Sequence, residues 1–595
     1  MFKNIAFYLL ALSLILICLW FVTETYYFFT HSREQIIFHY LQNNPNIYKP
    51  SVFKEFYFTE NTYKQALWFV SLAVGVGGML NIVYWKYRNF CKKLCQNAVQ
   101  LCIGHFFQFR KYVLACSKGQ IILLVFAFLS ILVHQIYTYQ HIFVAMDEAF
   151  SWLFFASQGS FVTLTHYPVP NNHIFYNLCS LFWSNFIGDE ILAMRLTSII
   201  AFWILLLLIF YYFLKTTNFQ TALFALMLVG LGFSQSVFAV QGRGYMLVAL
   251  CFFVALWSLQ TYLNNQNKGY LVFFTLACVI GFWTIPVFLY VFVSLYAYLI
   301  FAVWRKTIPK KVFIDFFKAG LIIGGIVYLC YCPVLMYSGF SALAGNENVS
   351  SKTYDTAWFF GYILSIALRE SVIYVMSLPK YTSFAVFAIL AIAFWQMYRK
   401  SKNLHFRFLW EFLLVSLVVT FAVICLMRAF PFYRVWTYYA IFLAILLAWL
   451  FDWLFSVLKN KWFCAFRCFE RSRNVQKTYF KYPLVWLISL NGLLAVGSYF
   501  QFWREIQDFY DLKAYEHHKN LTEASMDIIR KQQNVYLTVE AFYVKFWLEY
   551  TGNTHLLRQN SCKADVAVSK GSEAVPVCQE ADREIWFLRS HHHKN

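Results

Sequence analysis

Two adjacent acidic residues, Asp147 and Glu148, are the strongest candidates for chemistry in this sequence. They follow an apolar stretch, residues 121–140, in a chain of which only 13% of residues are charged. Two carboxylates at the mouth of a membrane segment are costly unless they face water, a cation or a substrate. Such carboxylates can take a proton from an attacking group, or hold a hard divalent cation such as Mg²⁺ or Mn²⁺. The alternative is structural, because acidic residues are common in the first turn of a helix.

Composition indicates which class of protein has to position these residues. The 595 residues are 60% hydrophobic and 22% aromatic, and the charged fraction is about half of the roughly 25% found in soluble proteins. The formal net charge of +21 could suggest nucleic-acid binding, but the basic residues occur in short runs between apolar segments. That pattern follows the positive-inside rule of membrane proteins. We therefore expect an all-α polytopic membrane protein that lies in a lipid bilayer and binds no nucleic acid.

Hydropathy over windows of about 19 residues predicts about thirteen membrane spans. They cover residues 5–21, 65–85, 121–140, 191–214, 221–240, 245–263, 270–283, 286–303, 319–336, 384–397, 408–427, 435–458 and 484–500. If these spans alternate, the basic loops 85–118, 305–311, 399–402 and 459–481 share one side, which the positive-inside rule makes the cytoplasm. Asp147 and Glu148 then face the extracytoplasmic side. This alternation requires that residues 270–283 and 286–303 form two spans rather than one kinked span.

The spans and loops suggest three domains. Residues 1–118 form an N-terminal extension of two spans with a basic cytoplasmic loop, and residues 119–503 form the transmembrane core. Residues 504–595 are the only substantial polar stretch, and we expect them to form a small extracytoplasmic α/β domain. Strand patterns at residues 534–540 and 584–588 and a helical pattern at residues 542–550 support this expectation.

Several cationic side chains near predicted span ends are candidates for binding a phosphate group. They are Arg243, Arg428, Arg434 and Lys380. Arginine offers planar, permanently charged donors to phosphate, although an arginine at a span end can instead reach lipid headgroups. His173 lies in the same outer region and is either a reactive group or a hydrogen-bonded structural residue. We interpret Glu190 and Arg195 as a structural charge pair.

Four motifs follow one another along the outer part of the predicted core. They are Asp147-Glu148, the turn Asn171-Asn172-His173 before an amphipathic helix, Gly188-Asp189-Glu190 with Arg195 downstream, and the junction Arg243-Gly244-Tyr245. Their order resembles that of the GT-C glycosyltransferases that use polyprenyl-phosphate sugars, a group that includes protein O-mannosyltransferases and the lipid A aminoarabinose transferase. The resemblance covers roughly residue 120 to the C-terminus, and two departures are Ile174 where the family usually has proline and the two additional N-terminal spans.

The resemblance implies an inverting glycosyltransferase that moves a sugar from a polyprenyl-phosphate donor to an acceptor on the extracytoplasmic face. The acceptor (protein, lipid or polysaccharide) stays open. The membrane is either the bacterial inner membrane, which we expect, or that of the endoplasmic reticulum. A transporter or flippase of lipid-linked glycans is the alternative and would need ionisable residues inside spans, whereas a membrane scaffold would need no acidic pair. The implied roles are a base for Asp147, an assisting or metal-binding role for Glu148, donor-phosphate binding for Arg243, Arg434 and Arg428, and other site roles for His173, Tyr245 and Lys380.

Overall fold

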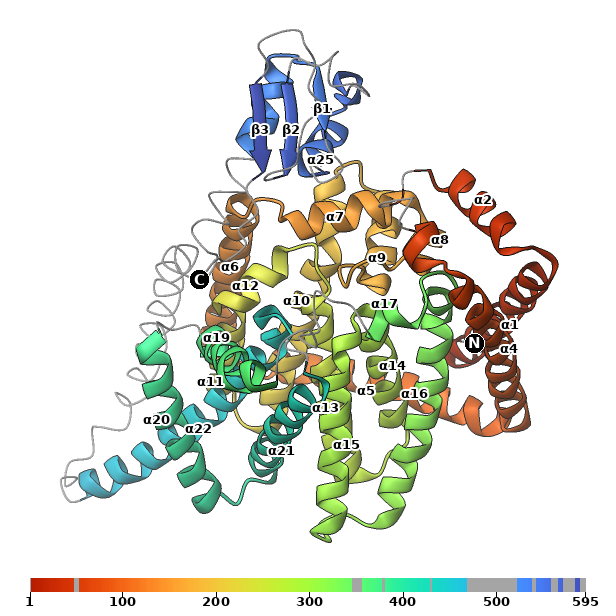
Figure 1. Ribbon diagram of the computed structural model, residues 1–595. Coiled ribbons are helices and arrows are strands. Elements are labelled where there is room, and N and C mark those ends of the chain that lie inside the picture. Colours follow the sequence, from red (N-terminus) through yellow and green to blue (C-terminus); the bar gives the residue numbers. More distant parts are fainter. Residues whose placement is uncertain are drawn as a thin grey trace.

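Helices crossing or lining a membrane make up most of the chain (Figure 1). The computed structural model describes residues 2–45, 47, 53–344, 356–376, 380–428, 431–467, 522–537, 542–557, 566–570 and 584–588. Within these residues, ten helical segments are long and apolar enough to cross a membrane, or eleven if a bent pair counts as one span. The chain is therefore an integral, multi-pass membrane protein.

The membrane-spanning helices pack around one large apolar core. The core is formed mainly by buried side chains of α10 (Glu190–Thr216), α11 (Phe219–Gly230), α13 (Tyr245–Asn265) and α22 (Thr437–Arg467). The other candidate spans are α1 (Phe2–Thr30), α4 (Glu60–Lys86), α6 (Lys118–His141), α15 (Leu289–Trp304) with the turn before it, α16 (Lys310–Tyr337), residues 356–376 and α21 (Leu404–Met427). The helix α20 (Lys380–Lys400) is not among the ten. The bent pair is α11 (Phe219–Gly230) with α12 (Phe233–Val240), whose axes differ by 65°.

The segments at residues 270–283 and 286–303 are two antiparallel helices, as the predicted alternation requires. α14 (Gly269–Thr284) ends just before a short 3₁₀ turn, η3 (Pro286–Phe288), and α15 returns beside it. Ring contacts pair Phe282 with Phe292 at 5.2 Å and Phe274 with Tyr296 at 6.2 Å, which is the order of an antiparallel hairpin. The loop that carries Arg305 therefore lies at the opposite end of the bundle from the turn at Pro286.

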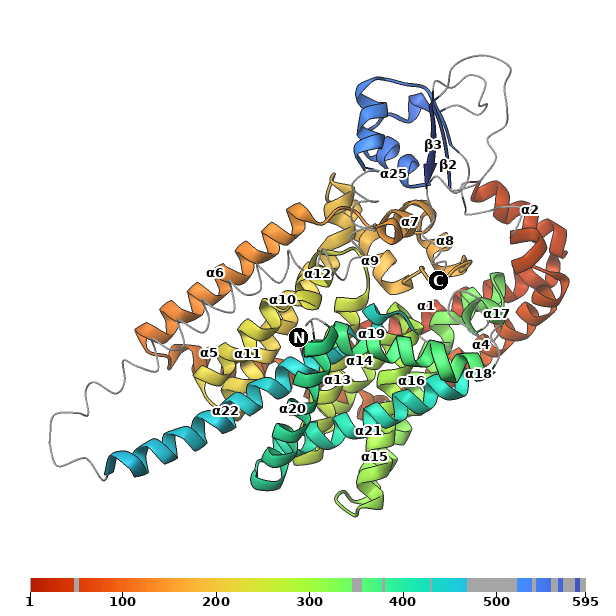
Figure 2. The ribbon, with the colours of Figure 1, turned by 60° about the vertical axis from the view of Figure 1, so that its left-hand side comes forward.

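The structure departs from the predicted spans and loops at two places. Residues 339–380 were expected to be a loop, but they contain α17 (Phe340–Ala344), α18 (Thr356–Trp358), η4 (Phe359–Ile363) and α19 (Leu364–Met376). Residues 356–376 are apolar enough for a span, and Figure 2 shows α19 crossing the direction of α15 rather than following it. The basic loop at residues 85–118 is largely a helix, α5 (Arg88–Leu114). The predicted span at residues 484–500 lies outside the described residues.

Three short helices form a layer at the end of the bundle opposite Arg305. They are α7 (Met146–Phe154), α8 (Ser160–Thr165) and α9 (Ile174–Ser184). Ser338, at the end of α16, ties this layer to the bundle because its Oγ donates to the carbonyl of Thr165 (2.8 Å) and accepts from the amide of Tyr167 (2.9 Å). The acidic pair lies on α7 and therefore at this end.

The N-terminal helices pack against the same layer. α2 (Arg33–Asn43) and the π-helical turn η1 (Phe53–Tyr57) connect α1 to α4. The hydroxyl of Tyr40 bonds with that of Thr165 at 2.9 Å, and Tyr57 Oη donates to the carbonyl of Pro168 at 3.1 Å. The two additional spans are thus fastened to the core beside α8.

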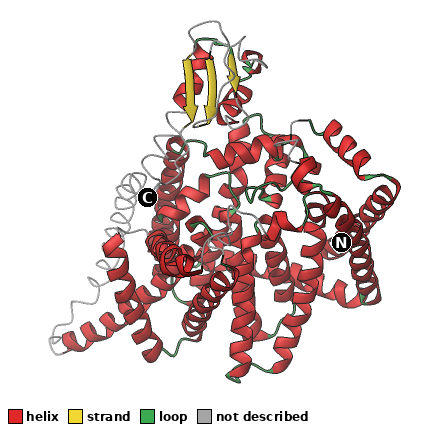
Figure 3. Ribbon diagram, in the orientation of Figure 1, coloured by secondary structure: helices red, strands yellow, loops and turns green. Residues whose placement is uncertain are grey.

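Near the C-terminus, three short strands lie together next to α7 (Figures 1 and 3). β1 (Val535–Leu537), β2 (Val566–Lys570) and β3 (Glu584–Leu588) pair in parallel in the order β1-β2-β3. α25 (Phe542–Tyr550) lies between this sheet and α7, where Tyr543 Oη donates to the carbonyl of Val144 at 2.7 Å. Buried side chains of α7 and α25 share one apolar cluster.

Candidate functional site

Asp147 lies in the first turn of α7, and its carboxylate is held by two arginines from distant parts of the chain. Its Oδ2 is 2.7 Å from Arg434 Nη2 and 3.7 Å from Arg243 Nη2. Arg434 comes from the 3₁₀ turn η5 (Tyr433–Trp436) that precedes α22, and Arg243 from the loop between α12 and α13. Three of the predicted site residues therefore meet at one point.

The two arginines differ in their access to solvent. The side chain of Arg434 is 31% exposed and that of Asp147 is 32% exposed, whereas that of Arg243 is only 3% exposed. Arg243 Nη1 also donates to the carbonyl of Asp147 (3.2 Å) and to Ser151 Oγ (3.1 Å). Arg243 therefore fixes α7 from the buried side, and the open side of the carboxylate faces Arg434.

The loop that carries Arg243 is itself held by the other predicted residues. The amide of Gly242 donates to Glu148 Oε1, and the amide of Gly244 donates to His173 Nδ1 at 3.0 Å. A Cβ on Gly242 would lie 2.9 Å from Glu148 Oε1, and one on Gly244 would lie 2.5 Å from Thr284 Cγ2. Glycine on both sides of Arg243 thus allows the backbone to approach these partners closely enough to aim its guanidinium at Asp147.

Glu148 forms a buried ion pair with Arg195. Its side chain is 0% exposed and that of Arg195 is 2% exposed, with Arg195 Nε 3.2 Å from Glu148 Oε1 and Nη2 3.3 Å from Oε2. Arg195 also donates to three carbonyls at the end of α6, those of Tyr139, Ile142 and Phe143. The predicted pairing of Arg195 with Glu190 is corrected: the fold turns Arg195 inward, toward α7.

The carboxylate of Glu148 does not fit a metal ion. Oε1 accepts from Gly242 and Arg195, while Oε2 accepts from Arg195 and from the amide of Ala145 at 2.8 Å. A cation at the acidic pair would therefore lie among hydrogen-bond donors. Among the residues whose placement is described, no group of three or more His, Cys, Asp or Glu side chains could hold a metal ion.

His173 has a structural role in this arrangement. It precedes α9 and is 2% exposed, and its Nδ1 accepts from the amide of Gly244. Burial, and then the positive charges of Arg243 and Arg434, hold the pKa of His173 well below its ordinary value. The ring is therefore neutral at physiological pH. Of the two roles predicted for His173, these contacts favour the structural one over the reactive one.

Tyr245 provides an aromatic face to both arginines. Its ring centre is 5.9 Å from the guanidinium carbon of Arg243 and 5.9 Å from that of Arg434. The ring of Tyr245 also meets that of His173 edge to face at 5.3 Å. Attraction between a cation and an aromatic face stabilises such a position, so Tyr245 helps to hold the two arginines near Asp147.

Two predicted site residues remain, Arg428 and Lys380. Arg428 is the C-cap of α21, with a left-handed backbone (φ 48°), shortly before Arg434. Lys380 begins α20, but its side chain lies outside the described residues. The sequence did not indicate Ser151 or the positioning role of Arg195. Glycine on both sides of Arg243 is a local feature that could have indicated a closely packed loop there.

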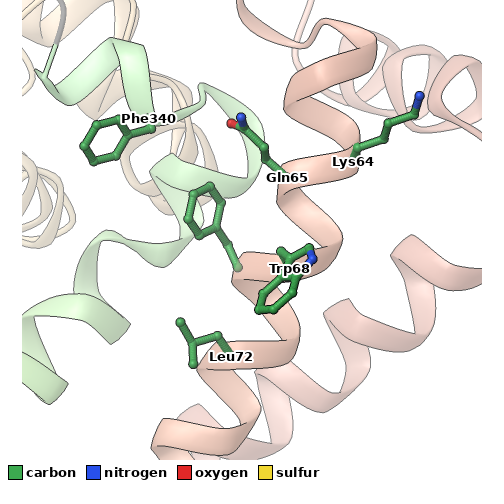
Figure 4. A pocket seen from close by; sticks show the side chains of 6 residues that line it. Lys64, Gln65, Trp68, Leu72 and Phe340 are labelled. Carbon is green, nitrogen blue, oxygen red and sulfur yellow. The ribbon is translucent and has the colours of Figure 1, made fainter.

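The surface also has a hollow that lies apart from Asp147 and its partners. It has a volume of about 460 Å³ and is lined by Lys64, Gln65, Trp68, Phe69, Leu72 and Phe340 (Figure 4). It opens between α4 and α17, and its lining is almost wholly apolar apart from Lys64 and Gln65.

Comparison with protein-family models, curated proteins and solved structures gives no match to this chain. The chemistry must therefore be judged from the geometry. Asp147, Glu148, Arg195, Arg243 and Arg434 together carry a net charge of +1, and the partly exposed members are one carboxylate and one guanidinium. Such a site can accept a proton and bind an anion side by side.

Proposed function

We propose that this protein is an integral-membrane glycosyltransferase that moves a sugar from a polyprenyl-phosphate donor to an acceptor on the extracytoplasmic face. The observation that supports it is the partly exposed Asp147 carboxylate between Arg434 and Arg243, at the end of the bundle away from the basic loop at Arg305. The motif order that resembles GT-C glycosyltransferases agrees with this geometry. We expect the membrane to be the bacterial inner membrane, with residues 504–595 forming a small α/β domain outside it.

The proposed reaction is an inverting displacement. A hydroxyl or amine of the acceptor attacks the anomeric carbon and forms the new glycosidic bond, while the bond from that carbon to the phosphate oxygen breaks. Asp147 takes the proton of the attacking group. Polyprenyl phosphate leaves with the bonding electron pair, and its growing negative charge is stabilised by guanidinium groups.

The exposure of each side chain suggests a different role for each residue of the site. The side chain of Arg434 is partly exposed, so its guanidinium could leave the Asp147 carboxylate and bind an oxygen of the donor phosphate instead. The carboxylate would then be available to the acceptor. Arg243 is buried and bonds the backbone of Asp147, so it would hold the base in place and add positive charge behind it. Glu148 and His173 would act through the loop at residues 242–244 rather than on substrate.

The alternative is a transporter or flippase of lipid-linked glycans. It is favoured by Glu24, an acidic residue inside the span α1, whose Oε2 accepts from Tyr337 Oη at 3.2 Å. An ionisable residue within a span often marks a transport path. The cluster around Asp147 lies instead in a layer of short helices and loops at one end of the bundle, where an acceptor and a membrane-bound donor could meet, and we therefore favour transfer.

The test is transfer of radiolabelled sugar from a panel of polyprenyl-phosphate sugars by membranes that contain the full chain. Asp147→Asn should reduce transfer by about 10²–10⁴-fold, the usual contribution of a positioned base. Asp189→Asn is the matched control: Asp189 caps α10 by accepting from the amide of Leu192, and asparagine caps a helix equally well.

Equal loss of transfer in both variants, or none in Asp147→Asn, would refute the role of Asp147. Movement of intact lipid-linked glycan across vesicles by wild type, without any transfer, would favour the transporter.

A further inference from the structure

α5 occupies an unusual position for a helix of 27 residues. It begins just after α4 ends at Lys86 and ends just before α6 begins at Lys118, so both of its ends lie at one end of the bundle. A helix of this length extends about 40 Å at 1.5 Å per residue. Because it joins two span ends on the same side and is not apolar enough for a span, we expect α5 to lie along the membrane surface instead of crossing the bilayer.

One face of α5 is fastened to the bundle by polar contacts. Asn97 Nδ2 donates to Asn267 Oδ1 at 2.7 Å, in the turn between α13 and α14. The two ring nitrogens of His105 bond the hydroxyls of Tyr211 (2.7 Å) and Tyr270 (2.8 Å). These bonds set the rotation of α5 about its own axis and therefore decide which residues face outward.

The outward face combines an apolar centre with basic ends. Ile103, Phe106 and Phe107 are 44%, 64% and 56% exposed. The exposed basic residues are Arg88 and Lys93 near the start and Arg110 and Lys111 near the end, and α5 contains no acidic residue. Beside the first basic group, Lys268 Nζ lies 5.3 Å from the ring centre of Phe90.

The apolar centre and basic ends of α5 match the interface of a lipid bilayer. Large aromatic side chains that face water are unfavourable, whereas in an interfacial helix they enter the boundary between headgroups and acyl chains. Lysine and arginine at the two ends can extend toward headgroup phosphates while their methylene stems stay in apolar surroundings. A helix with basic residues and no acidic ones attracts lipids of negative charge.

We propose that the outer face of α5 binds anionic phospholipids of the leaflet at the end of the bundle opposite Asp147. Phe106 and Phe107 lie against the acyl chains, and Lys93 and Lys111 bind headgroup phosphates. This inference stands independently of the proposed glycosyl transfer, because it depends on α5 and its contacts alone.

The first test is lipid affinity of the full chain in dodecyl maltoside, titrated with dihexanoyl phosphatidylglycerol or dihexanoyl phosphatidylcholine at low ionic strength. The phosphatidylglycerol should bind more tightly. Each basic residue at a membrane surface contributes about fivefold in affinity, so Lys93→Gln/Lys111→Gln should weaken phosphatidylglycerol binding about 30-fold.

The matched control is Lys64→Gln/Lys531→Gln, two exposed lysines at the other end of the molecule, each of which pairs with an acid four residues away. This control should bind phosphatidylglycerol as wild type does. Equal binding by the α5 variant and wild type, or an equal loss in the control, would overturn the proposal.

The second test asks what touches the aromatic centre. p-Benzoylphenylalanine in place of Phe107 is photoactivated in the full chain, first in nanodiscs of equal phosphatidylglycerol and phosphatidylcholine and then in native membranes. We expect phospholipid adducts enriched in phosphatidylglycerol, with less enrichment when Lys93 and Lys111 are neutralised. Adducts with another protein in native membranes, or none with lipid in nanodiscs, would overturn the proposal.

Discussion

Removing one member of the buried ion pair between Glu148 and Arg195 should destabilise the protein strongly. In Glu148→Leu, Arg195 would keep its three carbonyl acceptors but lose its counter-charge in a site where it is only 2% exposed. The amides of Gly242 and Ala145 would also lose their acceptor. Breaking a buried pair in this way costs about 3–5 kcal/mol, so we expect a loss of that size in the free energy of unfolding.

The assay is unfolding of the full chain by sodium dodecyl sulfate in dodecyl maltoside micelles. It compares wild type, Glu148→Leu, Arg195→Met and the double variant. Because the double variant leaves no unpaired charge, it should be more stable than Glu148→Leu and should show a coupling energy of about 2 kcal/mol or more. Additive losses from the two single variants would show that the pair does not act as a unit and would refute this reasoning.

A further variant of Glu148 tests whether this residue positions the loop at residues 242–244 or takes part in catalysis. Glu148→Gln keeps one side-chain oxygen that can accept from the amide of Gly242, so the loop that carries Arg243 should stay close to its native place. Sugar transfer should then fall far less than in Asp147→Asn. Equal loss in the two variants, in protein that is equally folded, would instead make Glu148 a catalytic residue.

Three further predictions concern the same layer. Gly242→Ala should destabilise the protein by about 1–3 kcal/mol, measured by the same unfolding assay, because its Cβ would lie 2.9 Å from Glu148 Oε1; unchanged stability would contradict the close approach. The pKa of His173 is lowered in the folded protein, so only the unfolded chain gains a proton below about pH 6.5, and stability falls with pH there by up to about 1.4 kcal/mol per unit. His173→Asn should have a shallower decline between pH 6.5 and 5.5 than wild type, and an equal slope would count against a neutral buried ring. Tyr245→Phe should keep sugar transfer and Tyr245→Leu should reduce it several-fold, because only the phenyl ring preserves the contact with both guanidinium groups; equal activities would exclude that contact as a factor.

Several properties of this protein follow from local sequence. Hydropathy depends on neighbouring residues within one window, so the membrane class and most spans could be recognised without a structure. The candidates Asp147, Arg243, Arg434 and Tyr245 could also be found, since each is a polar or aromatic group near a span end, and His173 lies in the same outer region. Their spacing along the chain, however, contains no information about which of them touch.

The contacts were decided by tertiary structure. Arg195 points toward Glu148 rather than Glu190 because α10 packs with that face against the end of α6 and the start of α7. Arg434 reaches Asp147 only because the turn before α22 lies beside α7. Hydropathy likewise could not show that residues 88–114 form a helix pinned along the bundle, because that depends on partners such as Tyr211 and Tyr270. Burial and ion pairing depend on the path of the whole chain, and local sequence specifies only the groups available for them.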